Sequence, residues 1–243
     1  MKEKSKTNKK IAVIVGVLFI IGTVAGILSV VITGPVFSSP DYLALIASDQ
    51  NSLVTGALMV LVMGFTLAMV PVVIFPVLKK HNEILALGYV VFRGALEPIT
   101  YIATAFSWLL LIPLSQEYMT SGAAASPYYQ TLSYLMVEAS KISGTLVAVV
   151  FPLGAIMFYV VLYQGKLIPR WISVWGLIAV VLHFLTSGVW GLFTLDHSMT
   201  ALQDMLAFPI FAQEMVMAVW MIVKGFNAIE IISPTAGTET NKA

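Results

Sequence analysis

The chain has 243 residues, of which 59% are hydrophobic and 10% are charged, and its formal net charge is +1. A soluble domain carries roughly 25% charged residues, so this composition excludes an ordinary soluble fold and indicates a membrane protein. The small net charge gives no basic surface for nucleic acid. The absence of cysteine excludes disulfides, thiolate metal sites and cysteine nucleophiles.

Six apolar stretches are each long enough to cross a bilayer, which takes about 20 helical residues. They lie at about 11–33, 53–77, 84–113, 131–163, 171–194 and 202–226. They predict an all-α bundle of six transmembrane helices in a single membrane domain, 11–226. Residues 1–10 are expected to form a basic cytoplasmic tail, and residues 227–243, with their Pro, Gly, Ser and Thr, a flexible cytoplasmic tail.

Two short features in and after the first span predict local structure. Gly22 and Gly26 form a small-xxx-small step that allows another helix to approach closely. Asp41 follows Pro40 in the first polar interruption, and we expect it to cap a short interfacial helix through residues 43–46.

The basic residues predict the orientation of the six spans. Eleven of the thirteen lie before the first span, in the second and fourth connections, or after the last span. The alternate connections, 34–52, 114–130 and 195–201, contain no Lys or Arg. The positive-inside rule therefore places both termini in the cytoplasm.

Six ionisable residues inside the predicted spans form a candidate binding cluster. They are Arg93, Glu97, Glu138, Lys141, His183 and Glu214. Spacings of four residues within the first pair and three within the second place each pair on one helix face. Because a charge in hydrocarbon costs a few kcal/mol or more, such residues face the protein interior. Counting about 1.5 Å per residue places all six between the middle of the membrane and its outer half, where we expect them to meet.

Pro98 adds a polar group to this region because it directly follows Glu97. Proline has no N–H, so the carbonyl of Gly94 loses its usual backbone donor and becomes an acceptor beside the charged pair.

The cluster has a structural and a functional interpretation. Its ion pairs could fix the register of the helices, or they could form a solute, proton or ion site. His183 is more often a hydrogen-bonded core residue than a ligand. The three glutamates and His183 are suitable metal ligands, but no His-Glu-x-x-His spacing supports a metal, and we expect no metal and no cofactor.

Three blocks of the sequence stand out. They are His81-Asn82-Glu83 with Ala86-Leu87-Gly88-Tyr89, Arg93 and Glu97; Ile168-Pro169-Arg170-Trp171-Ile172-Ser173 with Trp175-Gly176; and Gln213-Glu214-Met215 with Ala218-Val219-Trp220 and Val223-Lys224-Gly225-Phe226. Together they resemble one uncharacterised family of bacterial six-span membrane proteins. The family is a domain of unknown function, so the resemblance implies no activity or substrate. It implies that Arg93, Glu97 and Glu214 belong to the family's pattern, and that the chain is a multi-pass protein of the bacterial cytoplasmic membrane.

Three functions follow from these residues, and the first is favoured. The protein binds or transports a small polar or amphipathic solute, with Arg93 or Lys141 holding an anionic group and the glutamates holding cations or protons. Alternatively, it is a membrane-embedded enzyme acting on a lipid, with a carboxylate or His183 as general base, or a non-catalytic accessory subunit. The expected partners are the lipid bilayer and a small-molecule or lipid ligand, and no nucleic acid. The residues leave enzymatic activity, substrate and oligomeric state open, and we assign no catalytic residue.

Overall fold

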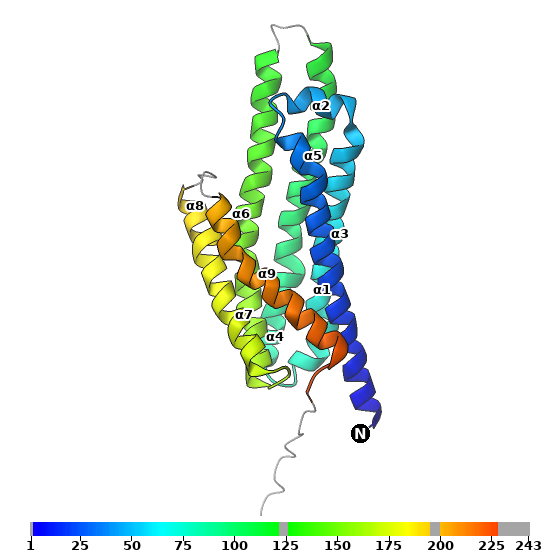
Figure 1. The fold of residues 1–243 in the computed structure, drawn as a ribbon, viewed down its shortest axis with the longest axis vertical. Coiled ribbons are helices and arrows are strands. Elements are labelled where there is room, and N and C mark those ends of the chain that lie inside the picture. The colour runs from blue at the N-terminus through cyan, green and yellow to red at the C-terminus, as the bar shows by residue number, and fades with distance from the viewer. Residues whose placement is uncertain (1, 122–125, 195–199, 228–243) are drawn as a thin grey trace, which may run out of the picture.

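The computed structural model describes residues 2–121, 126–194 and 200–227, and every regular element in these ranges is helical (Figure 1). In chain order the elements are α1 (Lys2–Phe37), α2 (Tyr42–Ser48), α3 (Gln50–Leu78), α4 (Glu83–Tyr89), the π-helical segment η1 (Val90–Leu96), α5 (Glu97–Thr120), α6 (Ser126–Gln164), α7 (Arg170–His183), the π-helical segment η2 (Phe184–Trp190), α8 (Gly191–Thr194) and α9 (Thr200–Val223). Two sets are continuous, because α4, η1 and α5 form one long helix and α7, η2 and α8 form another.

Six of these helices are long and apolar enough to cross a membrane. They are Thr7–Phe37, Gln50–Leu78, Glu83–Thr120, Ser126–Gln164, Arg170–Thr194 and Met205–Val223. Large apolar side chains are exposed on all of them, including Val30, Phe65, Phe106, Leu146, Ile178 and Val219. Uncovered apolar surface on every helix suits contact with lipid. The predicted all-α bundle of six membrane helices is confirmed.

The six helices pack in a closed ring that follows their order in the chain. α1 packs on α3, α3 on the α4–η1–α5 helix, α5 on α6, α6 on α7, α7 on α9, and α9 on α1. In such a ring the third helix faces the sixth across the middle, and the first faces the fourth. Phe19 of α1 stacks on Phe158 of α6, with ring centroids 6.4 Å apart, so these two side chains fill the centre.

The first two helices of the ring approach each other closely at the two predicted glycines. A Cβ atom on Gly22 would lie 2.8 Å from the Leu67 side chain, and one on Gly26 would lie 2.6 Å from the Met63 sulfur. Larger residues at these positions would push α3 away. The predicted close helix approach at Gly22 and Gly26 is therefore confirmed.

One end of the bundle, which we call the basic end, gathers the start of α1, the α3–α4 turn, the α6–α7 turn and the end of α9 (Figure 1). After α9, the backbone and side-chain amides of Asn227 donate to the carbonyls of Leu167 and Lys166 at 2.9 and 2.7 Å. Basic residues at this end are Lys9, Lys10, Lys79, Lys80, Lys166, Arg170 and Lys224. The start of the chain and the end of α9 thus lie on the same side of the bundle.

The opposite end, which we call the acidic end, contains α2, the end of α5 and the start of α6 (Figure 1). Asp41 Oδ1 accepts a hydrogen bond from the Ala44 N–H at 3.2 Å and begins α2, which confirms the predicted cap. Asp41, Asp49 and Glu117 lie here, in segments whose sequence contains no Lys or Arg.

The helices extend further than the apolar stretches that predicted them. α1 begins at Lys2, so the described part of the expected basic tail is the first turns of this helix. α6 has 39 residues, and at about 1.5 Å per residue it is nearly twice as long as a hydrocarbon core of about 30 Å. All of the predicted C-terminal tail except Asn227 lies outside the described residues.

Candidate functional site

The third membrane helix changes its geometry where it carries its charged residues. Arg93 lies in η1, and the N–H of Glu97 donates to the carbonyl of Phe92, five residues earlier, as in a π-helix. Pro98 follows at once and cannot donate, so the regular α-helical pattern is interrupted at this point. Short π-helical segments are rare and often mark functional sites.

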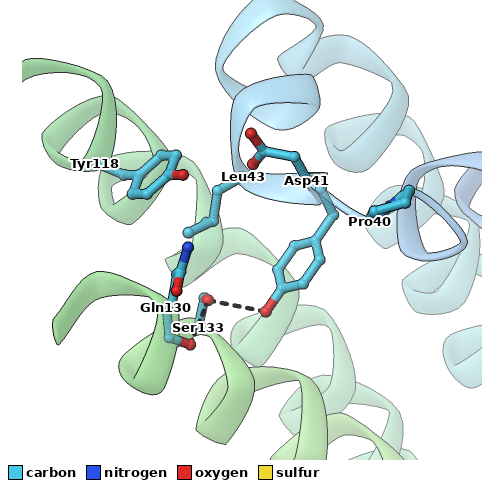
Figure 2. A pocket seen from close by; sticks show the side chains of 7 residues that line it. Pro40, Asp41, Leu43, Tyr118, Gln130 and Ser133 are labelled. Carbon is cyan, nitrogen blue, oxygen red and sulfur yellow. Dashed lines mark hydrogen bonds between the residues drawn. The ribbon is translucent and has the colours of Figure 1, made fainter. Parts of the chain in front are cut away.

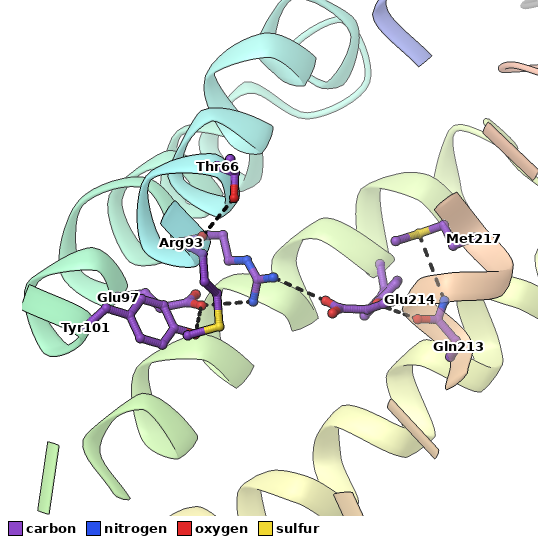
Figure 3. A network of polar contacts seen from close by, with 9 residues as sticks. Thr66, Arg93, Glu97, Tyr101, Gln213, Glu214 and Met217 are labelled. Atoms are coloured by element: carbon purple, nitrogen blue, oxygen red, sulfur yellow. Dashed lines mark hydrogen bonds and ion pairs between the residues drawn. The ribbon is translucent and has the colours of Figure 1, made fainter. Parts of the chain in front are cut away.

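Arg93, Glu97 and Glu214 form an ion-pair network that we call the charged cluster (Figure 3). Arg93 Nη1 lies 3.2 Å from Glu97 Oε1, and Arg93 Nη2 lies 3.3 Å from Glu214 Oε1. The side chains are 3%, 1% and 15% exposed, in that order. Because Arg93 is on the third membrane helix and Glu214 on the sixth, their ion pair crosses the middle of the ring.

Aromatic side chains surround the charged cluster. The Arg93 guanidinium lies 4.5 Å from the centroid of the Phe151 ring and 5.9 Å from that of Phe19. The hydroxyl of Tyr101 donates to Glu97 Oε1 at 2.9 Å. The negative faces of the rings attract the buried cation, so aromatic contacts replace part of its hydration.

The charged cluster is balanced neither in charge nor in hydrogen bonds. One guanidinium faces two carboxylates, which gives a net charge of −1 when both are ionised. Arg93 Nε and Glu97 Oε2 are buried without a hydrogen-bond partner among the described residues. An unsatisfied buried polar group costs about 1–3 kcal/mol. The cluster could therefore accept a proton, a cation or a polar group of a solute.

Gln213, next to Glu214 on α9, holds this helix in place. Its Oε1 accepts a hydrogen bond from the Tyr159 hydroxyl of α6 at 2.6 Å, and its Nε2 donates to the Ile172 carbonyl of α7 at 3.0 Å. The side chain of Gln213 is fully buried. Two adjacent polar residues thus connect α9 to three other helices, and this fixes the position of Glu214.

His183 adjoins the charged cluster through an aromatic ring. It lies at the end of α7, directly before η2, and its ring contacts that of Phe151 at 5.8 Å between centroids. The same Phe151 ring contacts Arg93 on η1. His183 Nδ1 is buried and has no hydrogen-bond partner among the described residues. Phe151 of α6 therefore contacts both Arg93 of η1 and the last residue of α7.

Glu138 and Lys141 lie apart from the charged cluster. Lys141 Nζ pairs with Glu138 Oε1 at 2.6 Å, and the two side chains are 44% and 22% exposed. Thr145, one turn further along α6, faces Gly191 at the start of the four-residue α8, so the pair lies on the acidic-end side of this contact, near the end of the fifth membrane helix. The expected single network of six residues is corrected on this point. The start of the apolar stretch at residue 131 does not mark the level of the neighbouring helices, because α6 begins at Ser126 and runs beside α5 past the end of α8.

No group of three His, Asp or Glu side chains that could hold a metal ion occurs within the described ranges. Glu97 and Glu214 both contact Arg93, Glu138 pairs with Lys141, and His183 contacts a phenyl ring. The four residues with suitable ligand chemistry are therefore distributed over three different environments.

Two polar neighbours of the charged cluster, Tyr101 and Gln213, make the contacts described above. The sequence analysis missed three aromatic residues of the site, Phe19, Phe151 and Tyr159. Aromatic residues are frequent in apolar spans, so the sequence carries no signal that distinguishes a ring over a guanidinium from one facing lipid. Only the order of the helices in the ring reveals them.

Six apolar helices in a closed ring, with a charged cluster at its centre, define a polytopic α-helical membrane protein with an intramembrane polar site. A family model described as "Domain of unknown function (DUF4386)" matches residues 14–225, and the chain belongs to this family. The matched region includes Arg93, Glu97 and Glu214. No curated protein and no solved structure matches the chain.

Proposed function

We propose that the protein binds a small polar or amphipathic solute at the charged cluster and transports it across the membrane together with a proton or a monovalent cation. The observation that carries this proposal is the charge imbalance among Arg93, Glu97 and Glu214. One arginine and one glutamate would suffice to lock two helices. The second buried carboxylate adds a negative charge whose burial is costly unless a positive charge joins it.

The geometry suggests how binding and proton uptake are coupled. The two Nη atoms of Arg93 contact different carboxylates, and Glu214 is the most exposed member of the cluster. Protonation of Glu214 weakens its attraction to Arg93 and frees Nη2 for an anionic group of the solute. Glu97 stays bound through Nη1 and through Tyr101, so the arginine keeps its position during the exchange.

Reconstituted vesicles test this function. The protein is placed in liposomes that contain a pH-sensitive dye, and an inward proton gradient is applied with glycine, succinate or choline outside. These three probes are zwitterionic, anionic and cationic, and none crosses a bilayer readily. We expect at least one of them to accelerate acidification of the vesicle interior. We expect Glu214→Gln to abolish that acceleration, because the amide cannot be protonated in this range of pH.

Glu138→Gln is the matched control, because it makes the same change from glutamate to glutamine in the exposed Glu138–Lys141 pair on α6. It should leave the acceleration unchanged. Absence of any solute-dependent proton movement with the unmodified protein would falsify the proposal, and so would equal rates for the unmodified protein and the Glu214→Gln variant.

One observation favours the alternative of a non-catalytic accessory subunit, namely the low exposure of Arg93 and Glu97. A dry cluster could serve helix pairing alone. In that case replacement of Arg93, Glu97 and Glu214 together by apolar residues of similar size would preserve the fold, since such replacements are often neutral or stabilising. The vesicle assay separates the two functions, because pairing alone moves no protons.

We further propose that the basic end lies in the cytoplasm, as the positive-inside rule indicates, and that the membrane is the bacterial cytoplasmic membrane. The chain has no cysteine, so single cysteines can be introduced near Lys166 and near Asp49 without background. A membrane-impermeant maleimide added to intact cells should label the second position and not the first. The reverse pattern would invert the topology.

A further inference from the structure

A pocket of about 380 Å³ lies at the acidic end of the bundle (Figure 2). It is lined by Pro40, Asp41, Tyr42, Leu43, Tyr118, Gln130 and Ser133. These residues come from the turn before α2, from α2 itself, from the end of α5 and from the start of α6. Tyr118 and Glu97 are about six turns apart on α5, roughly 30 Å, so this outer pocket is separate from the charged cluster.

Contacts between elements hold the outer pocket in shape. The Tyr42 hydroxyl of α2 lies 2.8 Å from Ser133 Oγ of α6, and Ser133 Oγ lies 2.9 Å from the Gln130 carbonyl, to which it donates. Ser133 is fully buried and Leu43 is 3% exposed, so both lie beneath the opening. The volume falls within the range of about 300–1,000 Å³ that is typical of small-molecule sites.

The charge of the outer pocket is negative. Asp41 uses Oδ1 to cap α2, and its side chain is exposed at the pocket. No Lys or Arg occurs in the sequence of residues 34–52 or 114–130, whose described parts lie at this end of the molecule. The nearest cation along α6 is Lys141, which is paired with Glu138 at 2.6 Å. A pocket lined by one sign of charge attracts the opposite sign.

Aromatic rings complete the lining. Figure 2 shows the Asp41 carboxylate and the Tyr118 ring on either side of Leu43, and Tyr42 also lines the pocket. A carboxylate combined with aromatic faces recognises organic ammonium groups, because the ring quadrupole and the carboxylate both attract a large, weakly hydrated cation. A bare metal ion would instead need several converging oxygen ligands. We infer that the outer pocket binds a small organic cation that carries a primary or quaternary ammonium group.

The experiment uses the full chain in nanodiscs of phosphatidylglycerol, a lipid without an ammonium group, and titrates choline and ethanolamine by calorimetry. Asp41→Asn should weaken binding about tenfold, since it removes a charge-assisted contact while asparagine still caps α2. Tyr118→Leu should weaken binding about threefold, and Tyr118→Phe, which keeps the ring, by less than about twofold.

Asp49→Asn is the matched control at the same end of the molecule. Its carboxylate accepts a hydrogen bond from Ser52 and does not line the outer pocket. This variant should leave choline binding unchanged. Equal weakening of choline binding by Asp49→Asn and Asp41→Asn would mean that choline is attracted by the overall surface charge and not by the outer pocket, and this would overturn the inference. Absence of choline binding in the unmodified protein would also overturn it.

Phosphatidylethanolamine in the nanodiscs then distinguishes the two sources of the ammonium group. If the lipid headgroup occupies the outer pocket, free choline should bind more weakly in these discs than in pure phosphatidylglycerol. If the ligand is a free amine, the two affinities should agree. Because the readout is binding at Asp41, failure of this inference leaves the transport proposal at Arg93 intact, and failure of transport leaves this inference intact.

Discussion

Two ion-pair groups in this protein have the same chemistry and nearly the same helical spacing, yet they lie in opposite environments. Arg93 pairs with Glu97 four residues away and is 3% exposed, whereas Lys141 pairs with Glu138 three residues away and is 44% exposed. The difference comes from the other helices. α9 supplies Glu214 opposite Arg93, and α6 supplies Phe151, while the Glu138–Lys141 pair lies where α6 continues past the end of α8. Helical spacing thus predicts which residues pair, and packing decides whether the pair is buried.

The prediction with the largest expected effect tests the difference in burial between the two ion pairs, with one substitution in each pair. Arg93→Met should lower the free energy of unfolding by about 3–5 kcal/mol, because it leaves two buried carboxylates without a cation. Lys141→Met should lower it by less than about 1 kcal/mol, because its partner is partly solvated. Reversible denaturant titration in detergent, followed by circular dichroism, measures both. Equal losses for the two variants would show that the burial difference has no energetic consequence.

The helix content could be predicted from sequence because it rests on local properties. Apolar length predicts membrane helices, and the alternation of basic residues between connections agrees with the two ends of the bundle. The end of α5 and the start of α6 could not be predicted, since Tyr118 and Tyr128 lie in parts of these helices that continue beyond the two apolar stretches. Helix continuation there depends on pairing of α5 with α6, which is a tertiary effect.

A prediction with a smaller expected effect concerns the close contact between α6 and η1. A Cβ atom on Gly154 of α6 would lie 3.2 Å from the backbone nitrogen of Arg93 and 3.1 Å from Cβ of Phe92. Gly154→Val should therefore push α6 away from η1 and destabilise the protein by about 1–3 kcal/mol. It should also slow the solute-dependent proton movement, because Phe151 and Arg93 separate.

Gly144, on the same helix, is the matched control, because a Cβ atom there would have no neighbour within 4 Å. Gly144→Val should change stability by less than about 0.5 kcal/mol. The same denaturant titration measures both valine variants. If Gly144→Val were as damaging as Gly154→Val, the effect would belong to valine in a membrane helix and not to the contact with η1.

The candidate site could be predicted in part, and the limit has a physical cause. Arg93, Glu97 and Glu214 stand out because charges in apolar spans are rare, and the structure brings these three together. The separation of Lys141 from them could not be predicted, because depth counted along one helix contains no information on how far its neighbours extend. The outer pocket was also missed, since its lining joins residues about 90 positions apart in the sequence, as in the contact of Tyr42 with Ser133.

The smallest expected effect concerns His81, a third kind of ionisable residue, which is half-buried and forms no ion pair with any residue that the structure describes. It lies in the α3–α4 turn with its ring against Gly165, and its Nε2 has no hydrogen-bond partner among the described residues. Burial, and then the neighbouring charge of Lys80, lowers the pKa of His81 below its ordinary value of 6.5. Near this pH the unfolded chain therefore binds more protons than the folded protein. The contribution of His81 to stability is complete above pH 6.5 and is lost as the pH falls toward the lowered pKa.

Thermal unfolding in detergent between about pH 5 and pH 7.5 should show a steeper decline in stability on acidification for the unmodified protein than for His81→Gln, since other groups titrate equally in both. Parallel curves would mean that the turn opens enough for water to solvate the imidazolium, and His81 would then behave like the exposed Lys141 and not like the buried Arg93.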